Sequence, residues 1–420
     1  MTNNNPALAP VADDQRVFSG MSHAALWFSL GVGLLVMQVG AYLVPAVGTR
    51  EALLAILLGS ILGSGLLAWT AKVGCDNGLS SAGLMHTVYG SSFARLPVLL
   101  NIVQLVGWTT FELVIMRDGT HAIVNKVLGM DTPILVSTLL WGGVLTLLMT
   151  GSMLTLVRRF VSRIGLPLVV LSLLWLSWHF WGVAQQQGLQ ALLDRQGNGS
   201  MGFLSAIDLV IAMPVSWLPL VADYARHGRS GRSTLRGTWI GYAIANAWCY
   251  GLGVLVASVS EPGTDLVTAL LLAQGGLLAL GLILLDELDN AYGDVYSGAV
   301  SLSSLRPTWS VRQWGIATAL VCTALACVLP MHSLEPFLLT LSSVFVPLYG
   351  VILGRLGCGT LPRTANTGVN MQAAVIWLLG IAVFHGTARW SPALGSALPA
   401  LLVTWLLAYA SRERSDKAQA

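Results

Sequence analysis

The most unusual stretch of this chain is Asp286-Glu287-Leu288-Asp289-Asn290-Ala291-Tyr292-Gly293-Asp294-Val295-Tyr296-Ser297. It follows the nearly pure hydrocarbon run 277–285 and precedes the small apolar run 298–302. Four carboxylates therefore lie inside a segment that otherwise has the composition of a membrane-spanning helix. Because a charge at that depth costs several kcal/mol, we expect these acids to face protein or water and to have a function.

The composition indicates a membrane protein. The chain has 420 residues, of which 55% are hydrophobic and 10% are charged, and its mean hydropathy is +0.72. Soluble proteins average about 25% charged residues. Apolar runs of about 20 residues, the length that crosses a bilayer as a helix, recur along the chain. We therefore predict an all-α polytopic membrane protein, and the net charge of +3 does not indicate a nucleic-acid partner.

The apolar runs predict twelve membrane-spanning helices. The expected spans are about 24–47, 51–73, 96–122, 133–155, 164–185, 203–225, 235–258, 275–304, 313–330, 335–355, 371–387 and 393–411. Twelve spans place 17 of the 22 Lys and Arg residues on one side and 5 on the other. Since cytoplasmic segments are enriched in Lys and Arg, both termini are expected in the cytoplasm, with tails at 1–22 and 412–420.

Two of these spans contain helix-breaking residues. Span 1 contains Gly31-Val32-Gly33 and then Gln38 and Gly40, and span 6 contains Pro214 and Pro219. Transporters often consist of inverted repeats whose discontinuous helices meet at a central site. An offset of 176 relates Gln38 to Pro214 and carries span 3 onto span 8. We therefore expect repeats at 23–190 and 191–356 and two further helices within 357–411, although similar apolar helices can give such an offset by chance.

Span 8 has a polar face. At 100° per residue, Asp286, Glu287, Asn290 and Asp294 fall within one sector, and Asp289 lies at its edge. An interhelical ion-pair network is the alternative, but few basic residues lie at membrane depth. Closely spaced carboxylates repel one another, so at least one is expected to hold a proton at neutral pH. This would suit proton coupling.

Span 3 carries a second polar row. Asn101, Gln104, Trp108 and Glu112 lie on one face, where they offer an aromatic plate, two amides and a carboxylate. A flat nitrogen heterocycle needs stacking on its face and donor–acceptor pairs at its edge. The alternative for Trp108 alone is a tryptophan at the bilayer interface. Glu112 can pair with ring or amino N–H groups of such a ligand.

Span 6 adds further polar residues. Ser216 and Trp217 follow Pro214, and Asp208 lies near the outer end of the span, where it could instead be an interface acid. Asp223 and Arg226 are interpreted as a gate or packing pair. The sequence has no phosphate loop, nucleophile elbow or zinc motif, so we expect neither an enzyme nor an ATP-driven pump, with no cofactor and no metal other than Na⁺.

Segments 103–109 and 212–226 resemble nucleobase–cation symporter family 1, in particular its branch of cytosine permeases and hydroxymethylpyrimidine transporters. Gly40-Ala41 and Asp294-Val295-Tyr296-Ser297 fit the same pattern. The resemblance implies a five-plus-five inverted repeat of the amino acid–polyamine–cation transporter type, two extra helices and alternating access. Two departures are visible. Met213-Pro214 stands where relatives often have an aromatic residue, and Asp289-Asn290 stands where sodium-dependent relatives have Ser or Thr, which favours protons.

The resemblance also implies a set of site residues. Trp108 would stack on the ring, Asp294 would bind its edge, and backbone carbonyls near Gln38 and Gly40 would help to hold a cation. The predicted substrate-binding residues are Gln38, Gln104, Trp108, Glu112, Ser216, Trp217 and Asp294. The predicted residues for cation or proton coupling are Gly40, Glu287, Asp289 and Asn290.

These observations predict a secondary active transporter of the inner membrane. It would import cytosine, hydroxymethylpyrimidine or a related heterocycle together with H⁺ or Na⁺. The expected partners are this small molecule, the cation and the lipid bilayer. Alternative substrates are allantoin, hydantoin, purines and thiamine-type compounds. An uncoupled channel or facilitator and a ligand-binding membrane sensor are alternatives from other functional classes.

Overall fold

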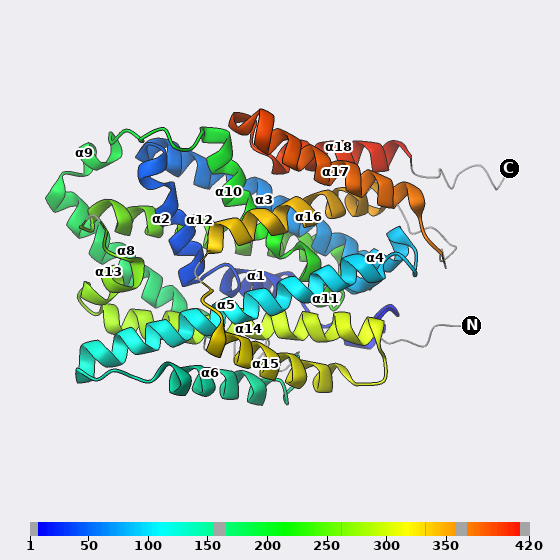
Figure 1. Cartoon of the computed structure of the whole chain (residues 1–420), viewed down its shortest axis with the longest axis horizontal. Coiled ribbons are helices and arrows are strands. Elements are labelled where there is room, and N and C mark those ends of the chain that lie inside the picture. Colours follow the sequence, from blue (N-terminus) through cyan, green and yellow to red (C-terminus); the bar gives the residue numbers. More distant parts are fainter. Residues whose placement is uncertain (1–6, 154–164, 262, 332, 358–367, 412–420) are drawn as a thin grey trace.

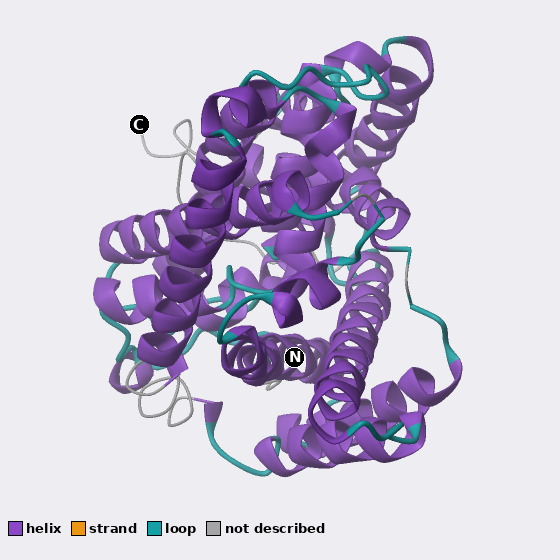
Figure 2. Cartoon of the chain, turned by 90° about the vertical axis from the view of Figure 1, so that its left-hand side faces the viewer, coloured by secondary structure: helices purple, strands orange, loops and turns teal. Residues whose placement is uncertain are grey.

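The structure, a computed structural model, describes residues 7–153, 165–261, 263–331, 333–357 and 368–411. Over these residues the regular structure is helical, apart from one isolated bridge between Phe18 and Gly228 (Figure 2). The helices are α1 Gly20–Ser29, α2 Leu34–Ala46, α3 Thr49–Asn77, α4 Ser81–Tyr89, α5 Arg95–Leu128, α6 Ile134–Leu148, α8 Leu166–Gln187, α9 Leu189–Leu193, α10 Phe203–Ser216, α11 Leu218–Ala225, α12 Gly231–Val259, α13 Leu266–Leu272, α14 Gly276–Leu305, α15 Val311–Val328, α16 Leu334–Leu356, α17 Met371–Trp390 and α18 Ala397–Ala410.

Each of the twelve predicted spans corresponds to a helix or a broken helix pair. Within the described residues, eight helices are long and apolar enough to cross a membrane, with α10 and α11 counted together, and the bent pair α1–α2 makes a ninth. The other three predicted spans correspond to α14, which carries the four acids, and to the shorter apolar helices α6 and α18. The all-α polytopic prediction is therefore confirmed.

The outer surface is apolar, as a bilayer requires. On α3 the large side chains Leu54 and Leu57 are exposed, whereas Gly59 and Gly63 are buried against α10. This is the reverse of a soluble helix, in which leucines face the core. Small residues at the contact let two helix backbones approach closely, and that packing replaces the hydrophobic effect as the source of stability in lipid.

The long helices run roughly parallel through the molecule (Figure 1). α14 lies along α5, and α12 packs against α3, α1 and α2. α17 and α18 pack against α16 at one edge of the bundle, and α6 and α15 lie at the opposite edge (Figure 1). Both ends of the described chain lie at the same end of the molecule, on the right in Figure 1, as an even number of crossings requires.

Two spans are discontinuous, as predicted. α1 and α2 are separated by four residues and meet at an angle of 62°. Trp217 separates α10 from α11, and Pro219 lies in the first turn of α11, where its missing N–H breaks no helical bond. The break of span 1 leaves backbone groups such as the Leu34 N–H and the Val32 carbonyl without helical partners, and these groups need other partners.

The repeat boundaries at 23–190, 191–356 and 357–411 stay predictions. Seven of the basic residues behind the predicted topology fall in 154–164, 358–367 and 412–420, and the predicted cytoplasmic tail is 412–420 itself. These positions lie outside the described residues.

Candidate functional site

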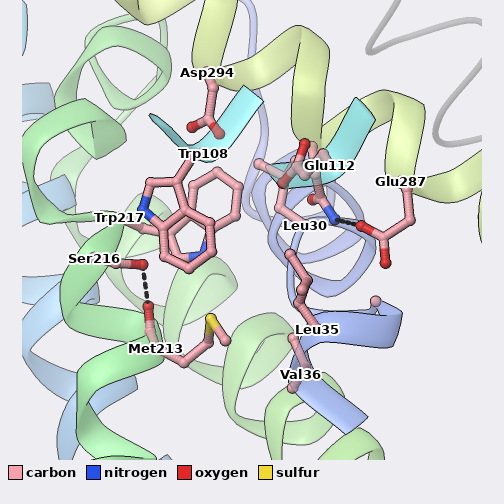
Figure 3. A pocket seen from close by; sticks show the side chains of 12 residues that line it. Leu30, Leu35, Val36, Trp108, Glu112, Met213, Ser216, Trp217, Glu287 and Asp294 are labelled. Carbon is pink, nitrogen blue, oxygen red and sulfur yellow. Dashed lines mark hydrogen bonds between the residues drawn. The ribbon is translucent and has the colours of Figure 1, made fainter. Parts of the chain in front are cut away.

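A cavity lies where the two discontinuous spans meet α5 and α14 (Figure 3). Its empty volume, with the open space at its mouth included, is about 360 Å³. The lining residues are Leu30, Gly33, Leu35, Val36, Trp108, Glu112, Met213, Ser216, Trp217, Glu287, Asn290 and Asp294.

Two indole rings contribute most of the flat apolar lining. Trp108 comes from α5, and its ring centroid lies 5.1 Å from that of Phe337 on α16 in an edge-on contact. Trp217, between α10 and α11, makes a similar contact with Trp27 at 6.0 Å. Both indoles are therefore held by neighbouring rings while they border the cavity. Such surfaces suit a planar ligand.

Two buried carboxylates of the lining have free acceptor atoms. Asp294 on α14 is 1% exposed, and neither of its oxygens has a hydrogen-bond partner among the described residues. The Oε2 atom of Glu112 on α5 is in the same situation, and so is the indole nitrogen of Trp108. A buried polar group without a partner is costly. The carboxylate oxygens are therefore available to a donor on a ligand or to a proton, and the indole N–H is available to an acceptor on a ligand.

Side chains of α14 satisfy the break between α1 and α2. Glu287 accepts the backbone N–H of Leu34, the first residue of α2. Asn290 donates from Nδ2 to the carbonyl oxygen of Val32 at 3.2 Å and to Glu287 at 3.3 Å. Asp286 accepts from the hydroxyl of Ser29 at 2.9 Å. The acidic face of α14 thus stabilises the broken span, with a carboxylate at the positive end of α2.

The structure brings together seven of the eleven predicted site residues. The residues that line the cavity are Trp108, Glu112, Ser216, Trp217, Glu287, Asn290 and Asp294. Asp289 is not part of the lining, and its Oδ2 atom lies 3.5 Å from the Ser29 hydroxyl. Asp289 therefore lies against the broken span, beside Asp286.

Three other predicted residues lie away from the lining. Gln38 is half-buried on α2. Gln104 is buried on α5 and donates to Asn101 at 2.9 Å. Gly40 is a packing residue, because a Cβ there would lie 2.3 Å from the backbone oxygen of Tyr250 on α12.

Asp208 and Asp223 have structural contacts outside the cavity. Asp208 accepts the backbone N–H groups of Ser396 and Ala397 at the start of α18, the latter at 2.8 Å. Asp223 on α11 accepts the N–H of Ser81 on α4 at 3.0 Å and the hydroxyl of Ser297 on α14. Asp208 therefore caps a helix, and Asp223 ties three helices together.

The end of the Asp223 span carries two more polar residues. Arg226 is 7% exposed, and its Nε atom has no hydrogen-bond partner among the described residues. Burial and the neighbouring Arg226 charge lower the pKa of His227 to about 4. His227 is therefore neutral at physiological pH, which leaves Arg226 as the positive charge beside Asp223.

Sequence reasoning missed several residues of this region. Ser29 donates to Asp286, and it lies one helical turn before Gly33. A polar side chain so close to a predicted helix break could have been recognised from the sequence as a candidate site residue. Leu35 and Val36 follow the break directly, but apolar residues in an apolar span carry no signal of their own. The contact of Phe337 with Trp108 joins positions far apart in the chain and could not be read from either span.

A membrane-embedded bundle whose two discontinuous helices enclose a cavity defines the class of the protein: it has a discontinuous-helix transporter fold. A family model described as "Permease for cytosine/purines, uracil, thiamine, allantoin" matches residues 10–409. The chain belongs to this family, as its sequence motifs predicted.

One curated protein and several solved structures are also similar to this chain. This chain is similar to the purine-cytosine permease FCY22 of Saccharomyces cerevisiae, with 27% identity over 139 residues. The matched segment covers 32% of this chain and 26% of the yeast protein. The fold is similar to that of Mhp1, a nucleobase-cation-symport-1 family transporter, in a closed conformation with bromovinylhydantoin bound. The TM-score is 0.81 at 17% identity, over 97% of this chain and 94% of Mhp1.

Two further structures share the fold. Inward-facing Mhp1 matches with a TM-score of 0.78 at 17% identity, over 97% of this chain and 92% of that chain. A Na⁺-coupled sialic acid symporter in a substrate-bound outward-open state matches with a TM-score of 0.64 at 12% identity, over 94% and 88%. The similarity therefore extends to the whole architecture, beyond one family.

Proposed function

We propose that this protein is a secondary active transporter that imports a nucleobase-like heterocycle together with a cation. The observation that carries the proposal is the composition of the cavity: two indoles and two carboxylates with free oxygens surround one space at the junction of the discontinuous spans. Stacking surfaces and edge acceptors are what a flat nitrogen heterocycle needs. Transporters of this architecture place substrate at such a junction.

We propose the proton as the coupling ion. The carbonyl oxygen of Val32, at the break of span 1, accepts from the Asn290 amide and so is already engaged by a side chain. Asp286 and Asp289 both lie within hydrogen-bonding distance of Ser29, so a proton on one carboxyl would relieve the repulsion between them. Both features support protons over Na⁺.

Uptake into proteoliposomes tests transport and coupling together. Radiolabelled cytosine, hypoxanthine, uracil, hydantoin, allantoin and thiamine would each be offered under an imposed pH gradient without Na⁺, and under a Na⁺ gradient at uniform pH. We expect accumulation of at least one heterocycle above its external concentration with the pH gradient alone. If no compound accumulates or competes under either gradient, the proposal is wrong.

The same assay separates coupled transport from a facilitator. A facilitator equilibrates its substrate but does not concentrate it, so dissipating the pH gradient would leave its final level unchanged. We expect the accumulated heterocycle to leak out after a protonophore is added. Accumulation that needs Na⁺ and ignores the pH gradient would contradict proton coupling while leaving the transporter proposal in place.

The proposed location is the cytoplasmic membrane of the cell, with both termini in the cytoplasm. The asymmetric distribution of Lys and Arg between alternating segments supports this orientation. A reporter active only in the cytoplasm, fused after residue 420, should be active, and its periplasm-specific counterpart should be silent. The reverse result would invert the topology.

A further inference from the structure

The hydrogen-bonding groups of the cavity are strongly one-sided. The lining contains three carboxylates, one amide, one hydroxyl and two indole N–H groups, and no lysine, arginine or histidine. Among the described residues, the ion pairs all involve other acids, so none of the three carboxylates is paired with a basic side chain. The cavity is therefore rich in acceptors and carries no positive side chain.

Some of these polar groups are already used by the protein. Both oxygens of Glu287 are engaged, one by the N–H of Leu34 and the other by Asn290. The hydroxyl of Ser216 donates to the carbonyl oxygen of Met213 in its own helix at 2.7 Å (Figure 3). These groups help to shape the cavity and offer a ligand little.

The groups that stay unpartnered define what the ligand must supply. Four buried acceptor atoms lack partners among the described residues: both oxygens of Asp294, Oε2 of Glu112 and Oδ1 of Asn290. Among the donors of the lining, only the indole N–H of Trp108 is buried without a partner among the described residues. Each orphaned acceptor is costly when buried, so a ligand that fills the cavity with donors regains that cost.

The helix terminus beside the cavity is closed to anions. The start of a broken helix usually attracts anionic groups of a substrate, because its N–H groups are free and its dipole is positive there. Here the carboxylate of Glu287 occupies the start of α2. An anionic ligand would therefore meet three carboxylates and no compensating charge.

We propose that the cavity recognises its ligand as a planar amidinium-type cation, that is, an amino-substituted heterocycle whose neighbouring ring nitrogen carries a proton. Such an edge presents two adjacent N–H donors, and the free oxygens of Asp294 can accept both, as a carboxylate does from arginine. If the ligand carries a carbonyl in place of the amino group, its acceptor oxygen faces the acceptor oxygen of Asp294 and no hydrogen bond forms. The inference rests on the proposed function and narrows its substrate class.

Two matched pairs of compounds test the inference on the purified full-length protein. In the first pair, cytosine and uracil differ by an amino group and a carbonyl on one ring. In the second, benzamidine and benzamide differ in whether the edge is a charged pair of donors or a neutral donor and acceptor. We expect the amino or amidinium member to bind more tightly in each pair, on the order of 100-fold, because a site built for particular hydrogen bonds rejects an analogue that lacks them.

Equal or inverted affinities within the two pairs would overturn the inference. If uracil binds as well as cytosine and accumulates in vesicles, the proposed transport function stands and only the cation-selective edge is wrong. If none of the heterocycles binds or accumulates, both proposals fall. These affinities are measured on the unaltered protein, so the test of the inference does not depend on whether a substituted variant folds.

Substitutions then locate the selectivity. Asp294→Asn replaces an oxygen acceptor by a donor at nearly the same volume, and Glu112→Gln does the same on the facing helix. Each should bring the cytosine-to-uracil ratio at least about 10-fold closer to one. Asp208→Asn is the matched control, since Asp208 caps α18 and lies outside the cavity lining. An unchanged ratio in both cavity variants would overturn the assignment.

Discussion

The carboxylate of Glu287 on α14 accepts the backbone N–H of Leu34, the residue at which α2 begins. One acid thus caps a half-helix that the break of span 1 leaves open, and the same acid borders the cavity. The cost of burying Glu287 is offset by a charge-assisted hydrogen bond and by the dipole of α2. The acids of α14 therefore shape the broken span as well as bordering the cavity.

Gly33→Ala tests this arrangement without altering any polar group. A Cβ at residue 33 would lie 2.8 Å from Oε1 of Glu287, so the carboxylate would have to move away from the start of α2. A hydrogen bond to a charged group is worth about 1.5–3 kcal/mol, so we expect uptake to fall by about 10-fold or more. Gly251→Ala on α12 is the control, because nothing lies within 4 Å of a Cβ there. Uptake that is equal in the two variants would contradict the arrangement.

Asp223→Ala should loosen one end of the molecule. Asp223 joins α11 to α4 and α14 through Ser81 and Ser297, and the distribution of Lys and Arg predicts that this end faces the cytoplasm. Losing two bonds to a buried carboxylate should shift the conformational equilibrium toward an inward-open state by about 10-fold or more. We would measure it as faster modification of Ser216→Cys by a thiol reagent from the cytoplasmic side, in a background without the native cysteines.

Graded variants provide the control for Asp223. Asp223→Asn keeps one acceptor and Ser297→Ala removes one donor, so both should lie between the parent and Asp223→Ala. Modification rates that do not follow this order would show that the contact is ordinary packing rather than a closure that opens during transport.

The positions of the helices could be predicted from the sequence for a simple physical reason. Each span is an apolar run of fixed minimum length, and the bilayer forces such runs into helices because no water satisfies the backbone. The breaks were equally visible, since Gly31, Gly33, Pro214 and Pro219 weaken helices at mid-depth. The polar face of α14 was also predictable, because side chains repeat at a fixed angle along a regular helix of 30 residues.

The placement of Gln38 and Gly40 could not be predicted in this way. The wheel of a straight span assumes one axis, but the chain turns by 62° between α1 and α2. Residues after the turn therefore face different neighbours from those that the wheel of a straight span gives. Gly40 meets the backbone of α12, and Gln38 lies outside the cavity lining.

Asp208→Ala should lower stability while sparing ligand binding. Asp208 accepts two backbone N–H groups at the start of α18, a capping interaction worth about 0.5–2 kcal/mol. We expect Tm in detergent to fall by a few degrees with unchanged affinity for the heterocycle. Asp194→Ala is a suitable control, because its pairing with Arg50 is on the surface and contributes little. Lost affinity at unchanged Tm would instead assign Asp208 a direct role in binding.

Gln104 and Glu112 lie on one face of α5, yet the structure separates their roles. Glu112 borders the cavity, whereas Gln104 donates to Asn101, which in turn donates to the carbonyl oxygen of Pro219 and to Ser301. A helical wheel gives the direction of a side chain but not what fills the space in front of it. Asn101 therefore links α5 to α11 and α14, and Gln104 supports Asn101 from the same helix instead of lining the cavity.

This separation predicts opposite kinetic effects of two substitutions. Glu112→Gln removes an acceptor that a ligand can use, so the affinity for cytosine should fall by about 10-fold or more with the maximal uptake rate little changed. Gln104→Ala removes the amide that supports Asn101 in its contacts with α11 and α14, outside the cavity lining, so the maximal rate should change while the affinity stays within about twofold. Binding to purified protein and uptake into vesicles measure the two quantities separately. A large loss of affinity in Gln104→Ala would place Gln104 in contact with the ligand after all.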